Sequence, residues 1–256
     1  MTQRILVTGS AGRLGRAAVR ELAARGHTVV GFDLRPTPGL PESQSVVGSL
    51  LDADLLAKAV AGADCLVHLA ATPDDNPARP AEANNFESEL LPNNVLAGYR
   101  VMEAARRAGV RKAILASTGQ VIDGHLEAGN TPVTVGMPYR PRYLYACTKV
   151  FLEMLGRVYA EQHGLRVLAV RLGWCPRDAG QVAEIASDPE AQDVFLSPGD
   201  AGRFFAAAAE AQKLPPWAAV YVTSKPVRHL LYDLEPAAKL TGWTPAEQWP
   251  TGAAEG

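Results

Sequence analysis

Cysteine, an excess of charge of one sign and long apolar runs are all scarce or missing in this chain of 256 residues. Its three cysteines, Cys65, Cys147 and Cys175, lie far apart and form no C-x-x-C pair, which argues against a disulfide scaffold and a cysteine metal site. Because 25 Lys and Arg residues are balanced by 27 Asp and Glu residues, we expect no nucleic-acid partner. No apolar run approaches the roughly 20 residues of a membrane-spanning helix, so we expect no membrane partner.

The composition is that of an ordinary globular protein, with 47% hydrophobic and 20% charged residues. The length suits one large α/β domain that can bury a core without metals or disulfides. A strand-like run over 4–7 begins so near the N-terminus that it leaves no room for a secretory signal. Together with reduced cysteines, this predicts a cytoplasmic protein.

Apolar runs of strand length alternate with segments of helical period, a pattern typical of βαβ units and a parallel sheet. The predicted strands are 4–8, 28–32, 65–69, 112–117, 166–172 and 220–223. The predicted helices are 13–24, 54–61, 90–108, 145–163, 201–212 and 235–240. Several helices are followed by a glycine, the residue that best tolerates a left-handed C-cap: Gly26, Gly62, Gly109 and Gly164. The chain therefore favours an α/β fold with a doubly wound parallel sheet.

Longer segments over 72–92, 119–143 and 175–199 interrupt this alternation. Each follows a predicted strand, and in open parallel sheets such segments form the ligand crevice. Since no repeat or flexible linker divides the chain, we expect a single domain over 1–256. A small substrate-binding cap would come mainly from 119–143, 175–199 and 224–256.

A glycine-rich turn over 8–15, with the sequence TGSAGRLG, joins the first predicted strand to the first predicted helix. Gly9 would form the tight turn, Gly12 would let the backbone approach a pyrophosphate, and Gly15 would let the helix pack closely. The free N–H groups and the positive dipole end of the helix would face the phosphates. This variant of the dinucleotide fingerprint predicts a Rossmann-like domain.

The choice of dinucleotide depends on the end of the second predicted strand. Asp33 can accept hydrogen bonds from ribose hydroxyls and repels a 2′-phosphate, which favours NAD over NADP. Arg35 is the competing signal, because a nearby arginine can accommodate the 2′-phosphate of NADP. We expect NAD as the cofactor.

Tyr145 and Lys149 are four residues apart on a predicted helix and therefore neighbours on one face. A tyrosine with a pKa of about 10 is a poor base at neutral pH. A nearby lysine charge stabilises the phenolate and lowers that pKa, which would let Tyr145 take a hydroxyl proton during hydride transfer.

With these motifs the chain resembles the short-chain dehydrogenase/reductase superfamily, in particular its extended branch of epimerases, dehydratases and related dehydrogenases. The similarity runs over nearly the whole sequence. The motifs that carry it are TGSAGRLG over 8–15, VHLAA over 67–71, NVLAG over 94–98, AST over 116–118, the Tyr145/Lys149 pair and LTGWTP over 240–245.

The resemblance implies that Tyr145 is the catalytic base and that Lys149 holds the phenol and the nicotinamide ribose. It implies that Thr118 helps to bind the reacting oxygen, with Ser117 as the fallback. The implied cofactor residues are Gly9, Ala11, Gly12, Arg13, Leu14, Gly15, Asp33, Leu34, Ser49, Leu50, Leu69, Ala70, Ala71, Asn94, Tyr145 and Lys149. Ser49 stands where the family usually has an aspartate, and Asn94 could equally be a capping or helix-surface asparagine.

The short C-terminal part is most similar to that of uronate dehydrogenases, which oxidise the anomeric carbon of a free sugar acid to its lactone with NAD. Their Asn-His pair after the catalytic hydroxyl is Gly119-Gln120 here, and one of their serines is Trp174. The implied substrate contacts are Thr72, Thr118, Gly119, Gln120, Trp174 and Arg177. Only Arg177 and Arg203 are candidates to bind a substrate carboxylate, and without such an arginine the substrate would be a neutral sugar or another alcohol.

The sequence thus predicts an NAD-dependent oxidoreductase that oxidises a hydroxyl of a sugar, a uronate-like sugar acid or a related small molecule. One alternative is a sugar-nucleotide epimerase or dehydratase, which the short C-terminal part disfavours. The other is a non-catalytic NAD-sensing protein, which has no need of an intact Thr-Tyr-Lys site. We expect no metal and interpret Asp74, Asp75 and Asn76 as a solvated turn. A homodimer could form through the helices over 90–108 and 145–163.

Overall fold

The computed structural model describes residues 2–73 and 84–254, which form one sheet of seven strands with helices on both faces. The strands are β1 (Arg4–Thr8), β2 (Thr28–Asp33), β3 (Ser45–Val47), β4 (Cys65–His68), β5 (Lys112–Thr118), β6 (Arg166–Leu172) and β7 (Trp217–Val222). The α-helices are α1 (Arg13–Ala24), α2 (Ala53–Val60), α3 (Ala97–Arg107), α4 (Asp123–Leu126), α5 (Leu144–His163), α6 (Ala179–Ser187), α7 (Pro189–Asp193), α8 (Pro198–Glu210) and α9 (Glu235–Thr241).

All neighbouring strands pair in parallel, in the order β3-β2-β1-β4-β5-β6-β7. The chain builds outward from β1 to β3 and then returns to build the other half from β4, so the direction reverses between β1 and β4. In such sheets ligands bind at the carboxyl ends of the strands near this switch point. The predicted doubly wound α/β fold is confirmed.

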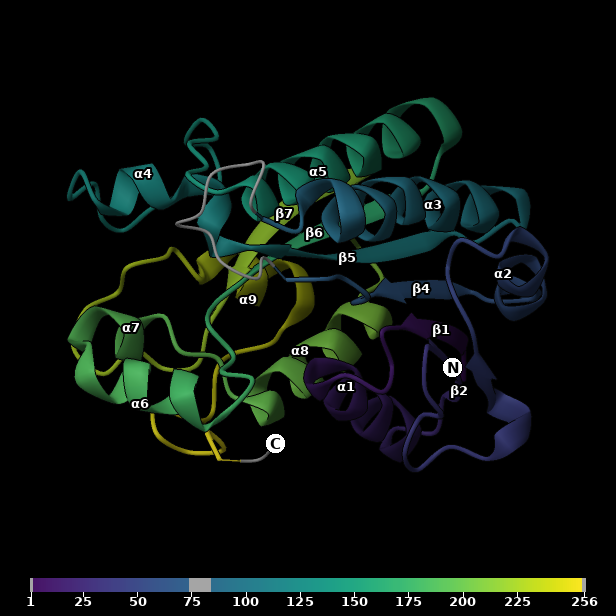
Figure 1. The fold of residues 1–256 in the computed structure, drawn as a ribbon, viewed down its shortest axis with the longest axis horizontal. Coiled ribbons are helices and arrows are strands. Elements are labelled where there is room, and N and C mark those ends of the chain that lie inside the picture. The colour runs from purple at the N-terminus through teal and green to yellow at the C-terminus, as the bar shows by residue number, and fades with distance from the viewer. Residues whose placement is uncertain (1, 74–83, 255–256) are drawn as a thin grey trace.

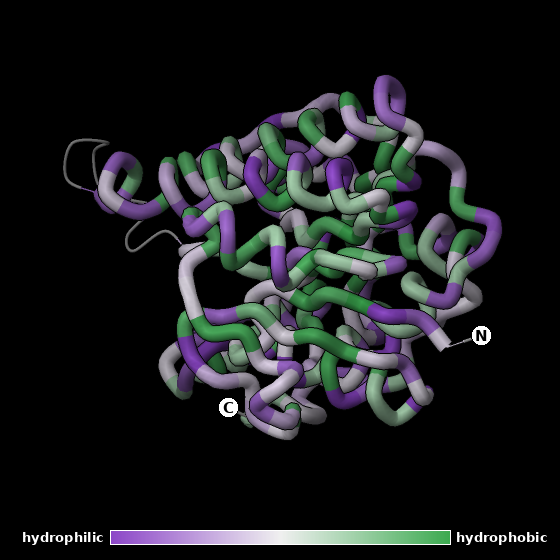
Figure 2. The backbone as a smooth tube through the Cα atoms, turned by 90° about the vertical axis from the view of Figure 1, so that its right-hand side faces the viewer, coloured by the Kyte–Doolittle hydropathy of each residue, from purple (hydrophilic) through white to green (hydrophobic). Residues whose placement is uncertain are grey.

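The sheet buries apolar side chains on both faces, which explains the near-continuous apolar strands. On β1, Ile5 and Val7 pack with α1 and α8, whereas Leu6 between them packs with α2, α3 and α5. This alternation follows from the two-residue period of a strand. Figure 1 shows α3 and α5 over one face and α1 and α8 over the other. In Figure 2 the hydrophobic strands form the layer between these helices.

The predicted strands are all present, with ends displaced by at most a few residues, and β3 was missed because it has only three residues. The predicted left-handed glycines are confirmed, since Gly26, Gly62, Gly109 and Gly164 all have positive φ. Local glycine chemistry therefore indicates correctly where these helices end.

The predicted helix over 90–108 is wrong over residues 90–96. Phe86–Leu96 is a π-helix, and regular α-helix begins only at Ala97. Pro92 lies inside the wider segment, where it has no N–H to donate and its ring disfavours an ordinary α-helical turn.

The segment over 175–199 contains two helices that we did not predict. Asp178 caps α6 by accepting a hydrogen bond from the N–H of Gln181, and Asp188 caps α7 by accepting one from Glu190. Pro189 occupies the first turn of α7, where its missing N–H costs nothing. The capping aspartates Asp178 and Asp188 were the sequence signal for the starts of these helices.

The segments predicted to form a cap contact one another beyond the sheet. Val133 forms an isolated parallel bridge with Tyr232, and the N–H of Ser224 donates to the carbonyl oxygen of Phe195 at 2.8 Å. In Figure 1, α4, α6 and α7 all lie on the side of the molecule towards which β5 points. Among the helices that the structure describes, none has both the length and the apolar character needed to cross a membrane.

Candidate active site

The glycine loop has the backbone that a phosphate cradle needs. Gly9 has a φ of +72°, and its N–H donates to the carbonyl oxygen of Phe32 at 2.8 Å. A Cβ at Gly15 would overlap the carbonyl oxygen of Gly9. A larger residue at position 15 would therefore push α1 away from the glycine loop. Gly12 has no side chain that could cap α1. The N–H groups of the first turn, such as those of Arg13 and Leu14, are therefore free to bind a phosphate.

Beside this loop lies a cleft with a volume of about 220 Å³. The region after β2 and β3 contributes Asp33, Leu34, Ser49 and Leu50, and the region after β4 contributes Leu69, Ala70 and Ala71. These segments, far apart in sequence, are the ones predicted to hold the cofactor. The cleft also includes Gly48, Leu51 and Asn93, which were not predicted because they belong to no distinctive motif.

The carboxylate of Asp33 supports the glycine loop and retains capacity for a ligand. Its Oδ2 accepts a hydrogen bond from the N–H of Ala11 at 3.0 Å, and its Oδ1 accepts one from the N–H of Arg35 at 3.3 Å. A carboxylate offers about four lone-pair positions, so others remain for ribose hydroxyls.

Arg13 was predicted to bind the cofactor, but its side chain contacts the C-terminal segment. One guanidinium nitrogen donates to the carbonyl oxygens of Gly252 at 2.9 Å and Ala253 at 2.7 Å. Only the backbone of Arg13 therefore keeps the predicted position at the glycine loop. No local sequence pattern indicates a contact over such a long separation.

Two of the predicted catalytic side chains lie one turn apart on α5, and the third lies on the strand that α5 contacts. The Nζ of Lys149 lies 5.5 Å from the centre of the Tyr145 ring and donates to the carbonyl oxygen of Ala116 at 2.9 Å. Ala116 lies on β5, whose last residue is Thr118. The oxygen of Thr118 accepts a bond from the N–H of Gln120 at 3.3 Å, so its own O–H can still donate.

Ser117, the fallback for Thr118, is committed to the core. It is 3% exposed, and its hydroxyl donates to Oε1 of Glu153 at 2.5 Å. Glu153 also pairs with Arg171 at 3.0 Å and accepts a bond from the hydroxyl of Tyr139 at 2.8 Å. This buried pair was not predicted, although two charged residues in apolar helix and strand segments were a visible signal.

Burial dominates the protonation of the site. It raises the pKa of Tyr145 to about 12, and the positive charge of Arg177 acts against that rise. Burial lowers the pKa of Lys149 to about 8. We predicted that the charge of Lys149 stabilises the Tyr145 phenolate, and the charge of Arg177 in the predicted cap acts in the same direction.

Burial also affects His68, which ends β4 beside the cleft. It lowers the pKa of His68 to about 3, and the charge of Lys149 lowers it further. The Nδ1 of His68 and the hydroxyl of Thr8 share a hydrogen bond of 2.7 Å. His68 is therefore a neutral, packed histidine near the predicted lysine.

Asn94 connects the cleft to the catalytic helix. Its side-chain oxygen accepts from the N–H of Thr72 at 2.8 Å, and its nitrogen donates to the carbonyl oxygen of Thr72 at 2.9 Å. The same nitrogen lies 3.3 Å from the hydroxyl oxygen of Thr148, the neighbour of Lys149. Asn94 thus orients the end of the cleft relative to α5, and it does so as a buried residue, not as a surface asparagine.

The predicted substrate residues have different surroundings. Trp174 packs in an apolar cluster with Phe195, and its indole N–H donates to Gln181 at 3.4 Å. Arg203 contacts Asp200 and Glu247, each at 2.7 Å, so its charge is already balanced. Arg177 is exposed and forms no ion pair within the described part of the chain. It is therefore the remaining candidate to bind a substrate carboxylate, and its charge acts on Tyr145.

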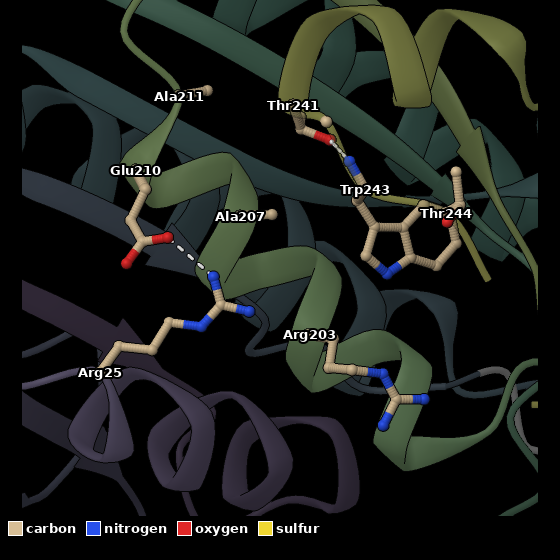
Figure 3. Close-up of a pocket in the computed structure, with 9 residues that line it drawn as sticks. Arg25, Arg203, Ala207, Glu210, Ala211, Thr241, Trp243 and Thr244 are labelled. Atoms are coloured by element: carbon tan, nitrogen blue, oxygen red, sulfur yellow. Dashed lines mark hydrogen bonds and ion pairs between the residues drawn. The ribbon is translucent and has the colours of Figure 1, made fainter. Parts of the chain in front are cut away.

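A larger hollow of about 420 Å³ lies elsewhere, between α8 and the turn after α9. Figure 3 shows Arg203 and Trp243 at this hollow, and Arg25 paired with Glu210 at 2.7 Å. It includes none of the predicted cofactor or catalytic residues. Within residues 2–73 and 84–254 there is no cluster of His, Cys, Asp and Glu suited to a metal ion, and Asp74, Asp75 and Asn76 lie outside the described residues.

Comparison with known proteins identifies the family of this chain. Residues 5–174 match the model of the NAD dependent epimerase/dehydratase family. The L-arabinose 1-dehydrogenase (NAD(P)(+)) of Haloferax volcanii is 34% identical and aligns over 97% of this chain and 98% of its own. The uronate dehydrogenase of Agrobacterium fabrum is 34% identical over 68% of this chain and 62% of its own length.

Among solved structures, a mutant uronate dehydrogenase from Agrobacterium tumefaciens complexed with NAD is 26% identical to this chain. It superposes with a TM-score of 0.75 over 96% of this chain and 86% of its own. The likeness therefore extends through the region predicted to form the cap. The fold, the glycine loop and these matches show that the chain belongs to the NAD-dependent epimerase/dehydratase family.

Proposed function

We propose that this protein is an NAD-dependent dehydrogenase that oxidises a hydroxyl of a free sugar, with Tyr145 as the base. The observation that carries the proposal is the contact between α5 and β5, which brings Tyr145 and Lys149 to the strand that ends at Thr118. That strand end lies at the edge of the sheet where the glycine loop and its cleft are found.

The residues of the cleft fit NAD. A glycine cradle without side chains and the free N–H groups of α1 suit a pyrophosphate. The remaining lone pairs of Asp33 suit the adenosine ribose, and Leu50 and Ala70 offer apolar walls. When bound, NAD supplies the acceptor for the hydride that leaves the substrate carbon.

The protein side of the reaction then has three parts. Thr118 donates to the reacting oxygen and holds it near the base. Tyr145, as phenolate, takes the hydroxyl proton while the C–H bond gives up its hydride and the C–O bond becomes a carbonyl. Lys149 uses one of its three donors on Ala116 and keeps the others for the cofactor ribose and the phenol.

For the substrate, a neutral aldose is favoured over a uronate. The relative that spans nearly the whole chain is named for L-arabinose, whereas the uronate dehydrogenase of A. fabrum aligns with only part of it. Of the two arginines considered for a carboxylate, Arg203 is already paired with two carboxylates. A uronate would therefore depend on Arg177 alone.

The test is cofactor reduction by the purified protein with a panel of pentoses, hexoses, uronic acids and secondary alcohols. The proposal expects NADH formation with aldoses, at higher kcat/KM than with the matching uronic acids. Oxidation of uronic acids alone would overturn the assignment of a neutral sugar. NAD binding without any oxidation would overturn the dehydrogenase itself and favour epimerisation or cofactor sensing.

We further propose that two copies pair through α3 and α5. Large apolar side chains are exposed on this side of the molecule, with Leu96 41%, Phe151 38% and Val158 51% exposed. Burying such a surface would stabilise association. Val158→Glu should convert a dimer into a monomer in sedimentation experiments, and a wild-type monomer would refute the pairing.

A further inference from the structure

Tyr232 is held firmly in the predicted cap although no sequence motif marks it. Its backbone lies in a parallel bridge with Val133. The N–H of Val133 donates to Leu231 at 2.8 Å, and the N–H of Asp233 donates to Val133 at 3.0 Å. Backbone bonds on both sides of Tyr232 therefore fix where its side chain begins.

The ring of Tyr232 is equally constrained. It stacks on the ring of Tyr221 with centres 4.8 Å apart and planes inclined by 9°, and Tyr232 is only 5% exposed. The hydroxyl of Tyr221 in turn lies 2.9 Å from a guanidinium nitrogen of Arg171, which is paired with Glu153. The stack thus links Tyr232, through Tyr221, to the buried ion pair of Arg171 and Glu153.

This arrangement brings the phenol of Tyr232 against Gly119, the residue after Thr118. A Cβ at Gly119 would overlap the hydroxyl oxygen of Tyr232 and would lie 2.8 Å from the ring carbon that bears it. The tyrosine therefore occupies the space that a side chain at position 119 would need. Tyr232, from the predicted cap, places its hydroxyl where Gly119, the residue after β5, has no side chain.

The hydroxyl of Tyr232 makes no hydrogen bond to any residue in the described part of the chain. The hydroxyl oxygen of Tyr232 is not fully enclosed by the protein, so a ligand or a water molecule can reach it. Burial raises the pKa of Tyr232, and the nearby charge of Asp123 raises it further. The group is therefore a neutral phenol that can both donate and accept.

We propose that Tyr232 is a substrate-binding residue whose hydroxyl hydrogen-bonds a second hydroxyl of the sugar while Thr118 binds the reacting oxygen. This inference rests on the proposed function, since it assigns a contact for the same substrate. Gly119 directly follows Thr118, so the hydroxyl of Tyr232 lies against the residue next to the one predicted to bind the reacting oxygen. A monosaccharide carries hydroxyls on adjacent carbons and suits such a pair, whereas a simple secondary alcohol would leave Tyr232 unpaired.

The primary test is Tyr232→Phe, assayed with the best aldose and with its monodeoxy analogues. Losing one neutral hydrogen bond should lower kcat/KM for the parent sugar about 10-fold. For the analogue that lacks the contacted hydroxyl, the variant and the wild type should be equal. The affinity for NAD and the melting temperature should not change, and Tyr99→Phe, on the exposed surface of α3, serves as the matched control.

Gly119→Ala gives a second, independent test, because its methyl group would displace the Tyr232 hydroxyl. The alanine should lower kcat/KM in the wild-type background and cost less in the Tyr232→Phe background, since both changes act on one contact. Equal losses in both backgrounds would contradict the inference.

The outcomes separate this inference from the proposed function. If the wild type oxidises aldoses but Tyr232→Phe matches it on every sugar, the inference fails and the proposed function stands. A uniform loss over all deoxy analogues would also overturn it, because that result indicates a packing role. A wild type that oxidises no sugar overturns both.

Discussion

The ammonium of Lys149 donates a hydrogen bond to the carbonyl oxygen of Ala116 at a distance of 2.9 Å. Ala116 lies two residues before Thr118 on β5, so this bond ties the helix of Tyr145 to the strand of Thr118. Both residues are buried, and a charged donor makes the bond stronger than one between neutral groups. One side chain thereby orients the groups to which we assign the chemistry.

Replacing Lys149 by methionine tests this double role. Lys149→Met keeps the length and apolar stem of the side chain but removes all three donors. We expect kcat/KM to fall by at least about 100-fold, because both the base and the cofactor ribose lose a partner. Steady-state kinetics with NAD, together with circular dichroism to show that the variant is folded, measure the effect; an active variant would refute the role.

Arg177 should affect the pH dependence of the reaction. Its charge lowers the pKa of Tyr145, so Arg177→Met should raise that pKa and move the rise of the pH–rate profile to higher pH. Arg177→Lys, which keeps the charge, should restore most of the profile. If Arg177→Met instead raises only KM for uronic acids and leaves the profile in place, the arginine binds a carboxylate and not the phenolate.

Asp33 should determine the preference for NAD. Asp33→Asn keeps an oxygen that can accept from the N–H of Ala11 but removes the charge that repels a 2′-phosphate. The ratio of kcat/KM for NADP to that for NAD should rise about 10-fold or more. Asp54→Asn, at an exposed position of α2, is the control, and an unchanged ratio in Asp33→Asn would contradict the assignment.

His68 should make the protein less stable in mild acid. The folded protein holds His68 neutral down to a pKa of about 3, whereas an unfolded histidine takes a proton near pH 6.5. The unfolded state therefore binds more protons below pH 6.5, and stability falls as the pH falls. From pH 7.5 to pH 5 this group alone should cost about 2 kcal/mol.

Urea unfolding at the two pH values measures this loss. The matched variant is His68→Asn, whose side-chain amide can still bond to Thr8 but cannot take up the proton. The variant should lose about 2 kcal/mol less than the wild type over the same range. Parallel losses in both proteins would show that other groups cause the acid sensitivity.

Local chemistry explains which parts of the structure could be predicted. Strands such as Arg166–Leu172 are apolar throughout because both faces of the sheet are covered, and helices that end at residues such as Gly164 need a left-handed residue there. The glycine loop and Asp33 form a pattern because one ligand requires them at fixed spacing.

The remaining features depend on contacts between distant segments. The guanidinium of Arg13 contacts Ala253, and the hydroxyl of Tyr232 meets Gly119, and neither spacing recurs as a motif. The π-helix around Pro92 likewise results from a competition between a proline and its neighbours that a periodic pattern does not reveal. The predicted cap and the individual roles of the site residues stay predictions that the variants above can test.

The most direct test of the account is the rate of NADH formation from NAD and an aldose such as L-arabinose, for the wild type and Tyr145→Phe. We predict turnover by the wild type, a loss of about 100-fold or more in the variant and equal binding of NAD by both. Tyr99→Phe should behave as the wild type. A variant that keeps its activity, or a wild type that binds NAD and oxidises no sugar, would contradict the central claim that Tyr145 is the base of a sugar dehydrogenase.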